Sequence, residues 1–390
     1  MKKTRSLKWI AVALAAVMIL SLTACGNQSN SNTESTTPSV APDASSEASA
    51  PAENKEAEEI TLRIGAGQTP QGFTWIESVT KYFMPYVDEK LAETGNYKIN
   101  WVEAWGGTVA KVDEIFEAVE GGLLDIGWVG NVFEASKLPA NNLSYHVPFN
   151  VRAKDVDQMA EAMQAMYDKY PELKGEYEKY KNKILGLTVL ESYNLATNFE
   201  VTSMDDLNGK KIGAAGANLV WFQGTGAVPV QSPGTEAYSS IQTGVYDGTI
   251  QHTLMLDTLK LYEVAPYITL GDFGSIWGGA LTINMDVFDG LPEEVQQALI
   301  EAGNEYTQGT VELEQQKLEA YKENMEAKGA KVSVLSDEQR IKWADSLDNL
   351  PAEYGETLDD MGYPGTQMMK DYVDFLKDAG ADMPRDWFGE

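Results

Sequence analysis

Side chains that could carry out catalysis are scarce in this sequence and form no recognisable set. Its two histidines, His146 and His252, lie far apart, and neither has motif-like neighbours. The stretch Ser78 to Lys81 spells S-x-x-K, but the partner motifs of penicillin-recognising enzymes are absent. Asp286 to Gly290 falls short of an EF-hand calcium loop. We therefore expect no enzyme, no catalytic residue, no metal site and no cofactor, and two structural histidines.

Aromatic residues offer more, because they supply binding rather than catalysis. The chain has nine tryptophans. Four of them stand beside glycines or at the ends of expected elements, namely Trp105, Trp128, Trp221 and Trp277. Core packing is the alternative for each of them, but an indole face can also stack on a flat ligand or hold a cation. We expect at least two tryptophans to line one pocket.

The elements that must position these residues alternate between strand and helix, which is typical of an α/β fold. One set of expected strands covers 60–67, 97–105 and 123–130. A second set covers 183–192, 210–216, 227–231 and 246–251. A long helix is expected over 292–329, which contains a single proline, at its start. These patterns predict a two-lobed clamshell like that of periplasmic binding proteins, with a long helix bracing both lobes and the ligand at the carboxyl ends of the strands.

The first residues are typical of an export signal. A basic start is followed by the apolar run from Ile10 to Leu22, which is too short to span a bilayer comfortably. The run ends in the letters "LTAC", which resemble a bacterial lipobox, and Cys25 is the only cysteine of the chain. We interpret 1–24 as a lipoprotein signal peptide and 25–59 as a lipidated Cys25 with a disordered, Ser/Thr/Ala/Pro-rich tether. The protein is then extracytoplasmic and lipid-anchored to the cell membrane, and its net charge of −29 argues against nucleic acid as a partner.

Several stretches in order resemble the solute-binding proteins of TRAP (tripartite ATP-independent periplasmic) transporters. They are "VEGGLLDIGWVG", "VPFNVRAKDV", "YSSIQTGVYDG", "LYEVAPYITL" and "TINMDVFDGLPEEVQQAL". The likeness runs from Ile60 to the C-terminus. It implies capture of a small organic solute, delivery to the TRAP membrane permease subunits, and a monomer without catalytic activity. Lobe I is expected from 60–190 and 284–390, and lobe II from 191–283.

The site departs from the family pattern. The resemblance implies that a strand "GxKIRxP" presents an arginine to a substrate carboxylate, a geometry that suits Arg, but Gly213 stands there in "GKKIGAAG". No arginine occurs between Arg152 and Arg340. We expect an organic acid held without the usual arginine clamp, or an aromatic or neutral solute. The expected ligand-binding residues are Trp105, Trp128, Gly130, Phe133, Gly213, Ala215, Trp221, Gln251 and Trp277.

Three other functions remain as alternatives. A solute-binding lipoprotein of an ABC importer would share the fold and differ in its membrane partner. A sensor component would bind solute and hand the ligand state to a receptor. An exported enzyme is disfavoured, because the sequence offers no catalytic constellation.

Overall fold

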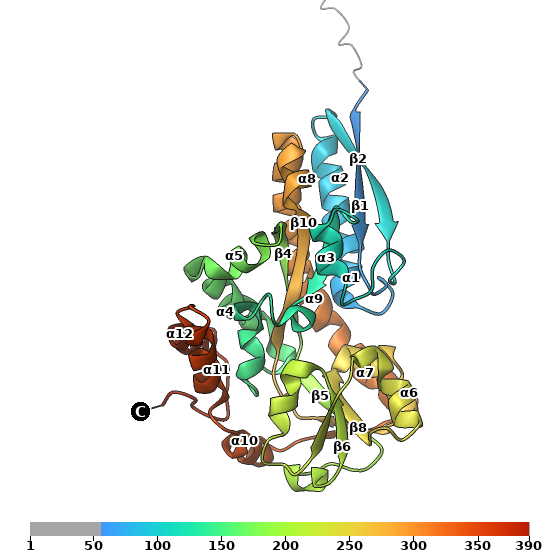
Figure 1. The fold of residues 1–390 in the computed structure, drawn as a ribbon. Coiled ribbons are helices and arrows are strands. Elements are labelled where there is room, and N and C mark those ends of the chain that lie inside the picture. Colours follow the sequence, from blue (N-terminus) through green and yellow to red (C-terminus); the bar gives the residue numbers. More distant parts are fainter. Residues whose placement is uncertain (1–55, 390) are drawn as a thin grey trace, which may run out of the picture. The chain divides into compact units, whose positions relative to one another are not determined.

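The computed structural model describes residues 56–389, which belong to one compact α/β unit with two separate β-sheets (Figure 1). The predicted signal peptide, Cys25 and nearly all of the predicted tether lie outside the described residues. One sheet has five strands in the order β2-β1-β3-β10-β4, and the other has six in the order β11-β9-β5-β8-β6-β7. The predicted two-lobed α/β architecture is confirmed.

The five-stranded sheet is formed by β1 (Glu58–Gly65), β2 (Tyr97–Ala104), β3 (Ile126–Gly130), β4 (Asn182–Leu190) and β10 (Ile276–Asn284). The six-stranded sheet is formed by β5 (Tyr193–Thr197), β6 (Lys211–Ala214), β7 (Val228–Gln231), β8 (Gly248–His252), β9 (Tyr267–Leu270) and β11 (Lys331–Val334). Each sheet contains a run of three adjacent strands that pair in parallel, β2-β1-β3 in one and β8-β6-β7 in the other, and the second sheet also contains the parallel pair β11-β9. The carboxyl ends of parallel strands are where ligands of such folds bind.

The helices include α1 (Thr74–Ser78), η1 (Val79–Phe83), α2 (Met84–Ala92), α3 (Ile115–Glu120), α4 (Val156–Lys169), α5 (Glu172–Glu178), α6 (Ala237–Gln242), α7 (Thr253–Thr258), α8 (Met285–Gly290), α9 (Glu293–Ala327), α10 (Asp337–Ser346), α11 (Leu350–Asp360) and α12 (Gly365–Asp378). Short 3-10 helices fill several loops: η2 (Asn131–Glu134), η3 (Ala140–His146), η4 (Ala153–Asp155), η5 (Met204–Leu207), η6 (Gly216–Phe222), η7 (Gly234–Glu236) and η8 (Leu261–Glu263). None of the helices in the described residues is long and apolar enough to cross a membrane.

Two strands belong to a different sheet from the one that the predicted lobe boundaries imply. β10 falls in the stretch assigned to lobe II, yet it pairs antiparallel with β3 and β4 in the five-stranded sheet. β11 falls in the stretch assigned to lobe I, yet it pairs with β9 in the six-stranded sheet. The sheets therefore do not follow the boundary at 283/284. All nine residues of β10 are buried, and a strand buried on both faces does not reveal from its sequence which sheet it will join.

The helix α9 contacts elements on both sheets, as the sequence predicted (Figure 1). On one side it packs on β4, where an added Cβ at Gly303 would lie 1.9 Å from the carbonyl oxygen of Leu185. On the other side it contacts α7, and Asn324 donates to Asp257 Oδ1 at 2.6 Å. Glycine at 303 is thus required for the helix to approach the strand so closely.

One expected helix is shorter than predicted, and the difference shapes the site. Val109, Val112, Ile115, Phe116 and Val119 follow a 3.6-residue period, which predicts a helix from about Val109, but α3 begins at Ile115. The residues before it form a loop, and Lys111, Val112 and Asp113 of this loop line a cavity.

Candidate functional site

Residues from both sheets line a cavity with two connected parts. The larger part, which we call the outer cleft, has a volume of about 1050 Å³. The smaller part, which we call the inner chamber, has a volume of about 80 Å³. The two parts share the side chains of Gln68, Val112, Val132, Phe133, Ala215, Pro233 and Thr235. A small organic molecule has room here, with its deeper end among the residues of the inner chamber.

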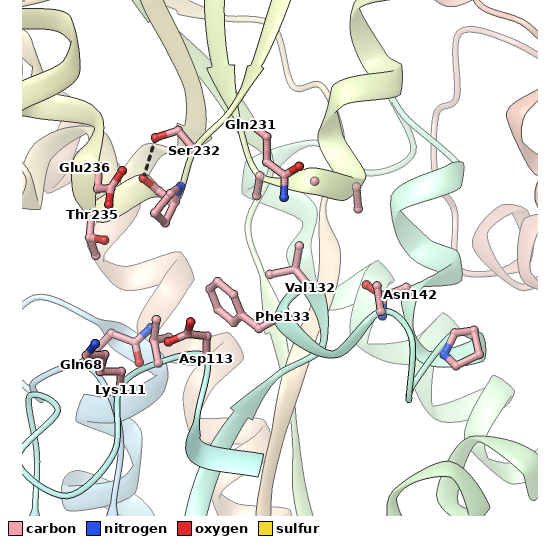
Figure 2. A pocket seen from close by; sticks show the side chains of 18 of the residues that line it. Gln68, Lys111, Asp113, Val132, Phe133, Asn142, Gln231, Ser232, Thr235 and Glu236 are labelled. Atoms are coloured by element: carbon pink, nitrogen blue, oxygen red, sulfur yellow. Dashed lines mark hydrogen bonds between the residues drawn. The ribbon is translucent and has the colours of Figure 1, made fainter. Parts of the chain in front are cut away.

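The outer cleft is formed where strands end. Gln68 follows β1, and Val132 and Phe133 follow β3; Gln231 ends β7 and Ser232 follows it. Figure 2 shows Gln231 and Ser232 on one side of the cleft and Gln68, Val132 and Phe133 on the other. A solute placed between them would touch both sheets at the carboxyl ends of parallel strands.

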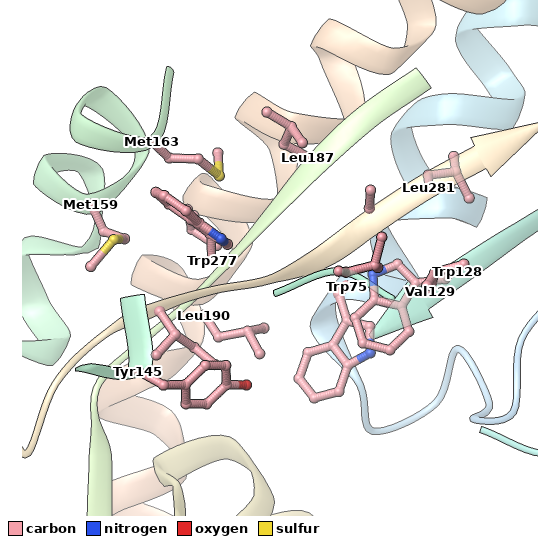
Figure 3. Packing of buried hydrophobic residues seen from close by; sticks show 14 of the residues in the cluster. Trp75, Trp128, Val129, Tyr145, Met159, Met163, Leu187, Leu190, Trp277 and Leu281 are labelled. Atoms are coloured by element: carbon pink, nitrogen blue, oxygen red, sulfur yellow. The ribbon is translucent and has the colours of Figure 1, made fainter. Parts of the chain in front are cut away.

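The inner chamber is walled by rings. Its ring-bearing side chains are Phe73, Trp75, Trp128, Phe133, Tyr145, Tyr193 and His252. The indoles of Trp75 and Trp128 lie 5.5 Å apart between ring centroids, and Figure 3 shows them packed together, with Tyr145 nearby. Trp128 donates its indole hydrogen to Thr188 Oγ1 at 2.9 Å, which fixes the orientation of this ring. Such walls favour a flat or apolar group.

Charged side chains are confined to the outer cleft. Lys111, Asp113 and Glu236 line it, and no Asp, Glu, Lys or Arg is among the described residues that line the inner chamber. Each arginine of the described part has structural partners and lines neither part of the cavity. Arg63 pairs with Asp125, Arg152 with Asp337 and Asp272, Arg340 with the carbonyls of Gly271 and Asp272, and Arg385 with the carbonyls of Ala344 and Leu347.

Buried titratable groups lie in the wall of the chamber and next to it. His252 Nδ1 lies 2.8 Å from the carbonyl oxygen of Glu191, and burial lowers the pKa of His252 to about 4. The Glu191 carboxylate accepts from Thr253 Oγ1 and from the backbone N–H of Leu254, and burial raises its pKa, with the charge of Glu314 adding to the effect. Burial also raises the pKa of Glu314, which accepts from Thr74. Burial thus disfavours the charged form of each of these three groups.

The predicted site residues separate into two groups in the structure. Trp128, Gly130, Phe133, Ala215 and Gln251 line the cavity. An added Cβ at Gly130 would lie 2.9 Å from the ring of Phe133 and 3.2 Å from that of Trp128, so glycine lets both rings close over the chamber.

Trp105, Trp221, Trp277 and Gly213 line neither part of the cavity, contrary to the expectation. Trp105 follows β2 and donates to Glu103 Oε2 at 2.5 Å. Trp221 and Trp277 are core residues, whose indoles donate to the carbonyls of Tyr145 at 2.6 Å and Asn141 at 2.5 Å. Both satisfy their single polar atom on the backbone, which is how buried tryptophans pack.

The surroundings of Gly213 correct our interpretation of that position. An added Cβ would lie 2.6 Å from Cζ of Tyr246, a ring that is 2% exposed. Tyr246 therefore fills the space beside Gly213, and the missing side chain does not enlarge the pocket. At Gly234, which lines the inner chamber, Met255 and the amide of Gln251 likewise occupy the room that a side chain would need.

The sequence analysis missed five ring residues of the chamber, namely Phe73, Trp75, Tyr145, Tyr193 and His252. Trp75 lies in the short helix α1, which follows the glycine-containing loop after β1. Tyr145 lies in η3, which carries no periodicity to reveal it, and Tyr193 begins β5. The signal available was the aromatic pair Phe73 and Trp75 behind a glycine-rich strand end.

Both histidines line the cavity, His146 in the outer cleft and His252 in the inner chamber, so the expectation of two purely structural histidines does not fit. His146 stacks on Tyr354 with ring centroids 3.5 Å apart, and burial lowers the pKa of His146 to about 3. Among the described residues, no cluster of three or more His, Cys, Asp or Glu side chains could hold a metal ion.

Comparisons with known proteins agree with this geometry. A family model described as DctP, bacterial extracellular solute-binding protein, family 7, matches residues 66–357. The ectoine-binding periplasmic protein TeaA of Halomonas elongata is 28% identical over 60% of this chain and 69% of its own length. The ectoine/5-hydroxyectoine-binding periplasmic protein UehA of Ruegeria pomeroyi is 26% identical over 79% of this chain and 93% of its own.

A solved structure shares the fold. The TRAP solute-binding protein of Rhodoferax ferrireducens, in complex with copurified benzoate, superposes with a TM-score of 0.70 over 82% of this chain and 98% of its own, at 17% identity. The two sheets and the long helix thus form the fold of periplasmic binding proteins.

Proposed function

Because the chain belongs to the DctP family of bacterial extracellular solute-binding proteins, we propose that it captures a small, flat organic solute and delivers it to the membrane subunits of a TRAP transporter. The observation that carries the proposal is the inner chamber, which is walled by aromatic rings from both sheets and lined by no charged side chain. Apolar walls with a few polar groups are typical of small-molecule sites.

The solute is held without an arginine clamp. The described arginines are engaged with carboxylates or backbone carbonyls away from the cavity. Gly213 has no side chain, and Tyr246 occupies the space beside it. Lys111 is the one Lys or Arg among the described residues lining the outer cleft, where Asp113 lines the same cleft. A C4-dicarboxylate would find no fork of two N–H donors for either carboxylate.

Some relatives are named for ring-shaped solutes, whereas others are named for C4-dicarboxylates or 2,3-diketo-L-gulonate. TeaA and UehA are named for ectoine, and the structure from Rhodoferax ferrireducens holds benzoate. Both molecules are small ring compounds. The aromatic walls around Trp75 and Trp128 offer flat surfaces to such a ring.

Binding of this solute favours a closed form of the protein. A molecule in the cavity touches residues of both sheets, for example Phe133 and Ala215. The bound solute favours the form of the protein in which it contacts both sides, and the size of this shift is set by the difference between its affinities for the closed and the open form. Closure then changes the surface that the membrane subunits meet.

A thermal-shift screen with ring compounds, organic acids and amino acids tests the proposal, because a ligand of the folded state raises its apparent stability. We expect a flat ring compound to give the largest shift and to compact the protein in small-angle scattering. A strong hit that leaves the scattering curve unchanged would count against closure.

The anchor is a separate part of the proposal. The "LTAC" motif supports lipidation of Cys25, with 25–59 as a tether that holds a monomeric receptor near the membrane. Mass spectrometry of the membrane-bound protein should find a diacylglycerol on an N-terminal Cys25, and Cys25→Ala should release the protein from the membrane. A gene neighbourhood with a two-component permease separates the TRAP assignment from an ABC importer, and restored uptake in a transport assay separates it from a sensor component.

A further inference from the structure

The amide of Gln251 has an orientation that hydrogen bonding determines. Thr249 Oγ1 donates its only hydrogen to the carbonyl oxygen of Gly213 at 2.9 Å. The hydroxyl can therefore only accept from Gln251, whose Nε2 lies 3.5 Å away. Oε1 of Gln251 forms no hydrogen bond within the described part of the chain, and this residue lines the inner chamber. Gly234 leaves room for this amide, since an added Cβ would lie 2.8 Å from Oε1.

The next residue supplies a second acceptor. His252 Nδ1 faces the carbonyl oxygen of Glu191 at 2.8 Å, and a carbonyl can only accept, so Nδ1 carries the hydrogen. Because burial lowers the pKa of His252 to about 4, the ring is neutral at pH 7 and Nε2 presents a lone pair. The ring packs against Tyr193 at 3.8 Å and Trp75 at 6.4 Å between centroids. Nε2 forms no hydrogen bond within the described residues, and His252 lines the chamber.

The charge around these two acceptors decides what can enter. The lining of the inner chamber includes no cationic side chain among the described residues, and Lys111 lies in the outer cleft. A carboxylate entering the chamber would lose its water and face two lone pairs, which is costly. A group with N–H or O–H hydrogens would satisfy both acceptors, and a delocalised cation would gain further from the aromatic faces.

We infer that the inner chamber selects the hydrogen-bond-donating end of its solute, an amidine, amide or ring N–H, through Gln251 Oε1 and His252 Nε2, and that any carboxylate of the solute stays in the outer cleft. The inference rests on the proposed function, since it takes the inner chamber to be part of the solute site.

Two planar compounds of the same shape provide the test. Benzamidine presents N–H donors where benzoate presents carboxylate oxygens. Isothermal titration calorimetry on the full chain at 0.15 M salt should find benzamidine bound at least about tenfold more tightly than benzoate, since two hydrogen bonds distinguish the probes. Equal or tighter binding of benzoate, or no binding of either probe at millimolar concentration, overturns the inference. If another solute still binds and compacts the protein, the proposed function stands while this inference fails.

Variants test whether the amide of Gln251 causes the preference for benzamidine over benzoate. Gln251→Met keeps the length of the side chain and removes Oε1, and we expect the benzamidine-to-benzoate ratio to fall at least about fivefold. Gln242→Met is the matched control, because Gln242 is exposed at the end of α6 and lines neither part of the cavity. Both affinities are measured on one sample, so a partly unfolded variant changes them equally. An unchanged ratio in Gln251→Met overturns the role of Gln251.

Discussion

Protonation of His252 should link the binding site to the stability of the fold. The ring is buried between Tyr193 and Trp75, and burial lowers its pKa from 6.5 to about 4. A base whose pKa is lower in the folded state contributes its full stability above pH 6.5 and loses it as the pH falls towards 4. Each pH unit in this window costs about 1.4 kcal/mol of the free energy of unfolding. Between pH 7 and pH 5 the loss from this one group is about 2 kcal/mol.

His252→Asn isolates this contribution. The asparagine amide can still donate to the carbonyl of Glu191, as Nδ1 does at 2.8 Å, but it does not titrate. The loss of ring packing destabilises the variant at every pH, and the raised pKa values of Glu191 and Glu314 affect both proteins. We therefore expect the difference in free energy of unfolding between variant and wild type to move by about 2 kcal/mol in favour of the variant from pH 7 to pH 5. Urea unfolding followed by circular dichroism measures this difference.

A pH-independent difference would refute the reasoning, because it would mean that His252 titrates in the folded protein as it does in the unfolded chain. The second histidine provides an extension. Burial lowers the pKa of His146 to about 3, so His146→Asn should show the same sign. The chain has only these two histidines, and the double variant should have the smallest loss of stability between pH 7 and pH 5.

Three further predictions concern packing and charge. Gly213→Arg should destabilise the fold by about 2–3 kcal/mol in chemical unfolding, because its Cβ would lie 2.6 Å from the ring of Tyr246. Adding Tyr246→Ala should recover part of this loss and create affinity for a carboxylate. A single variant as stable as wild type would contradict the position of Tyr246. Glu314→Gln should gain stability relative to wild type as the pH rises, because a buried carboxyl with a raised pKa loses stability on ionising. The exposed Glu312→Gln on the same helix should follow wild type. Gly303→Val should cost about 3 kcal/mol or more and lower the melting temperature, since Cβ would meet the backbone of β4 at 1.9 Å; an unchanged melting temperature would contradict the close packing of α9 on β4.

The sequence predicted the architecture well because it depends on regular patterns. Alternating strands and helices indicated two α/β sets, and the unbroken helical stretch indicated α9. The sheet that β10 joins was not predictable, because burial on both faces removes the alternation that would reveal a strand's surroundings. The strand β11 is short, mostly exposed and at the edge of its sheet, so its sequence carries little pattern.

The site was predicted only in part, and the reasons are physical. Trp128 and Gln251 were predicted correctly, because they lie near the ends of β3 and β8, where the strands meet the cavity. Trp221 and Trp277 have similar neighbours in the sequence, but their indoles bind backbone carbonyls in the core. The role of Gly213 depended on Tyr246, a residue on another segment, and no local pattern shows that contact.

Calorimetry on the purified protein tests the central claim most directly. The claim is that a flat solute binds among aromatic rings without an arginine clamp. The titration compares succinate and malate with a panel of neutral, cationic and zwitterionic ring compounds. We predict that at least one ring compound binds more tightly than either dicarboxylate, with a negative heat-capacity change from apolar burial. Tight binding of succinate or malate, with no binding of any ring compound, would contradict the account.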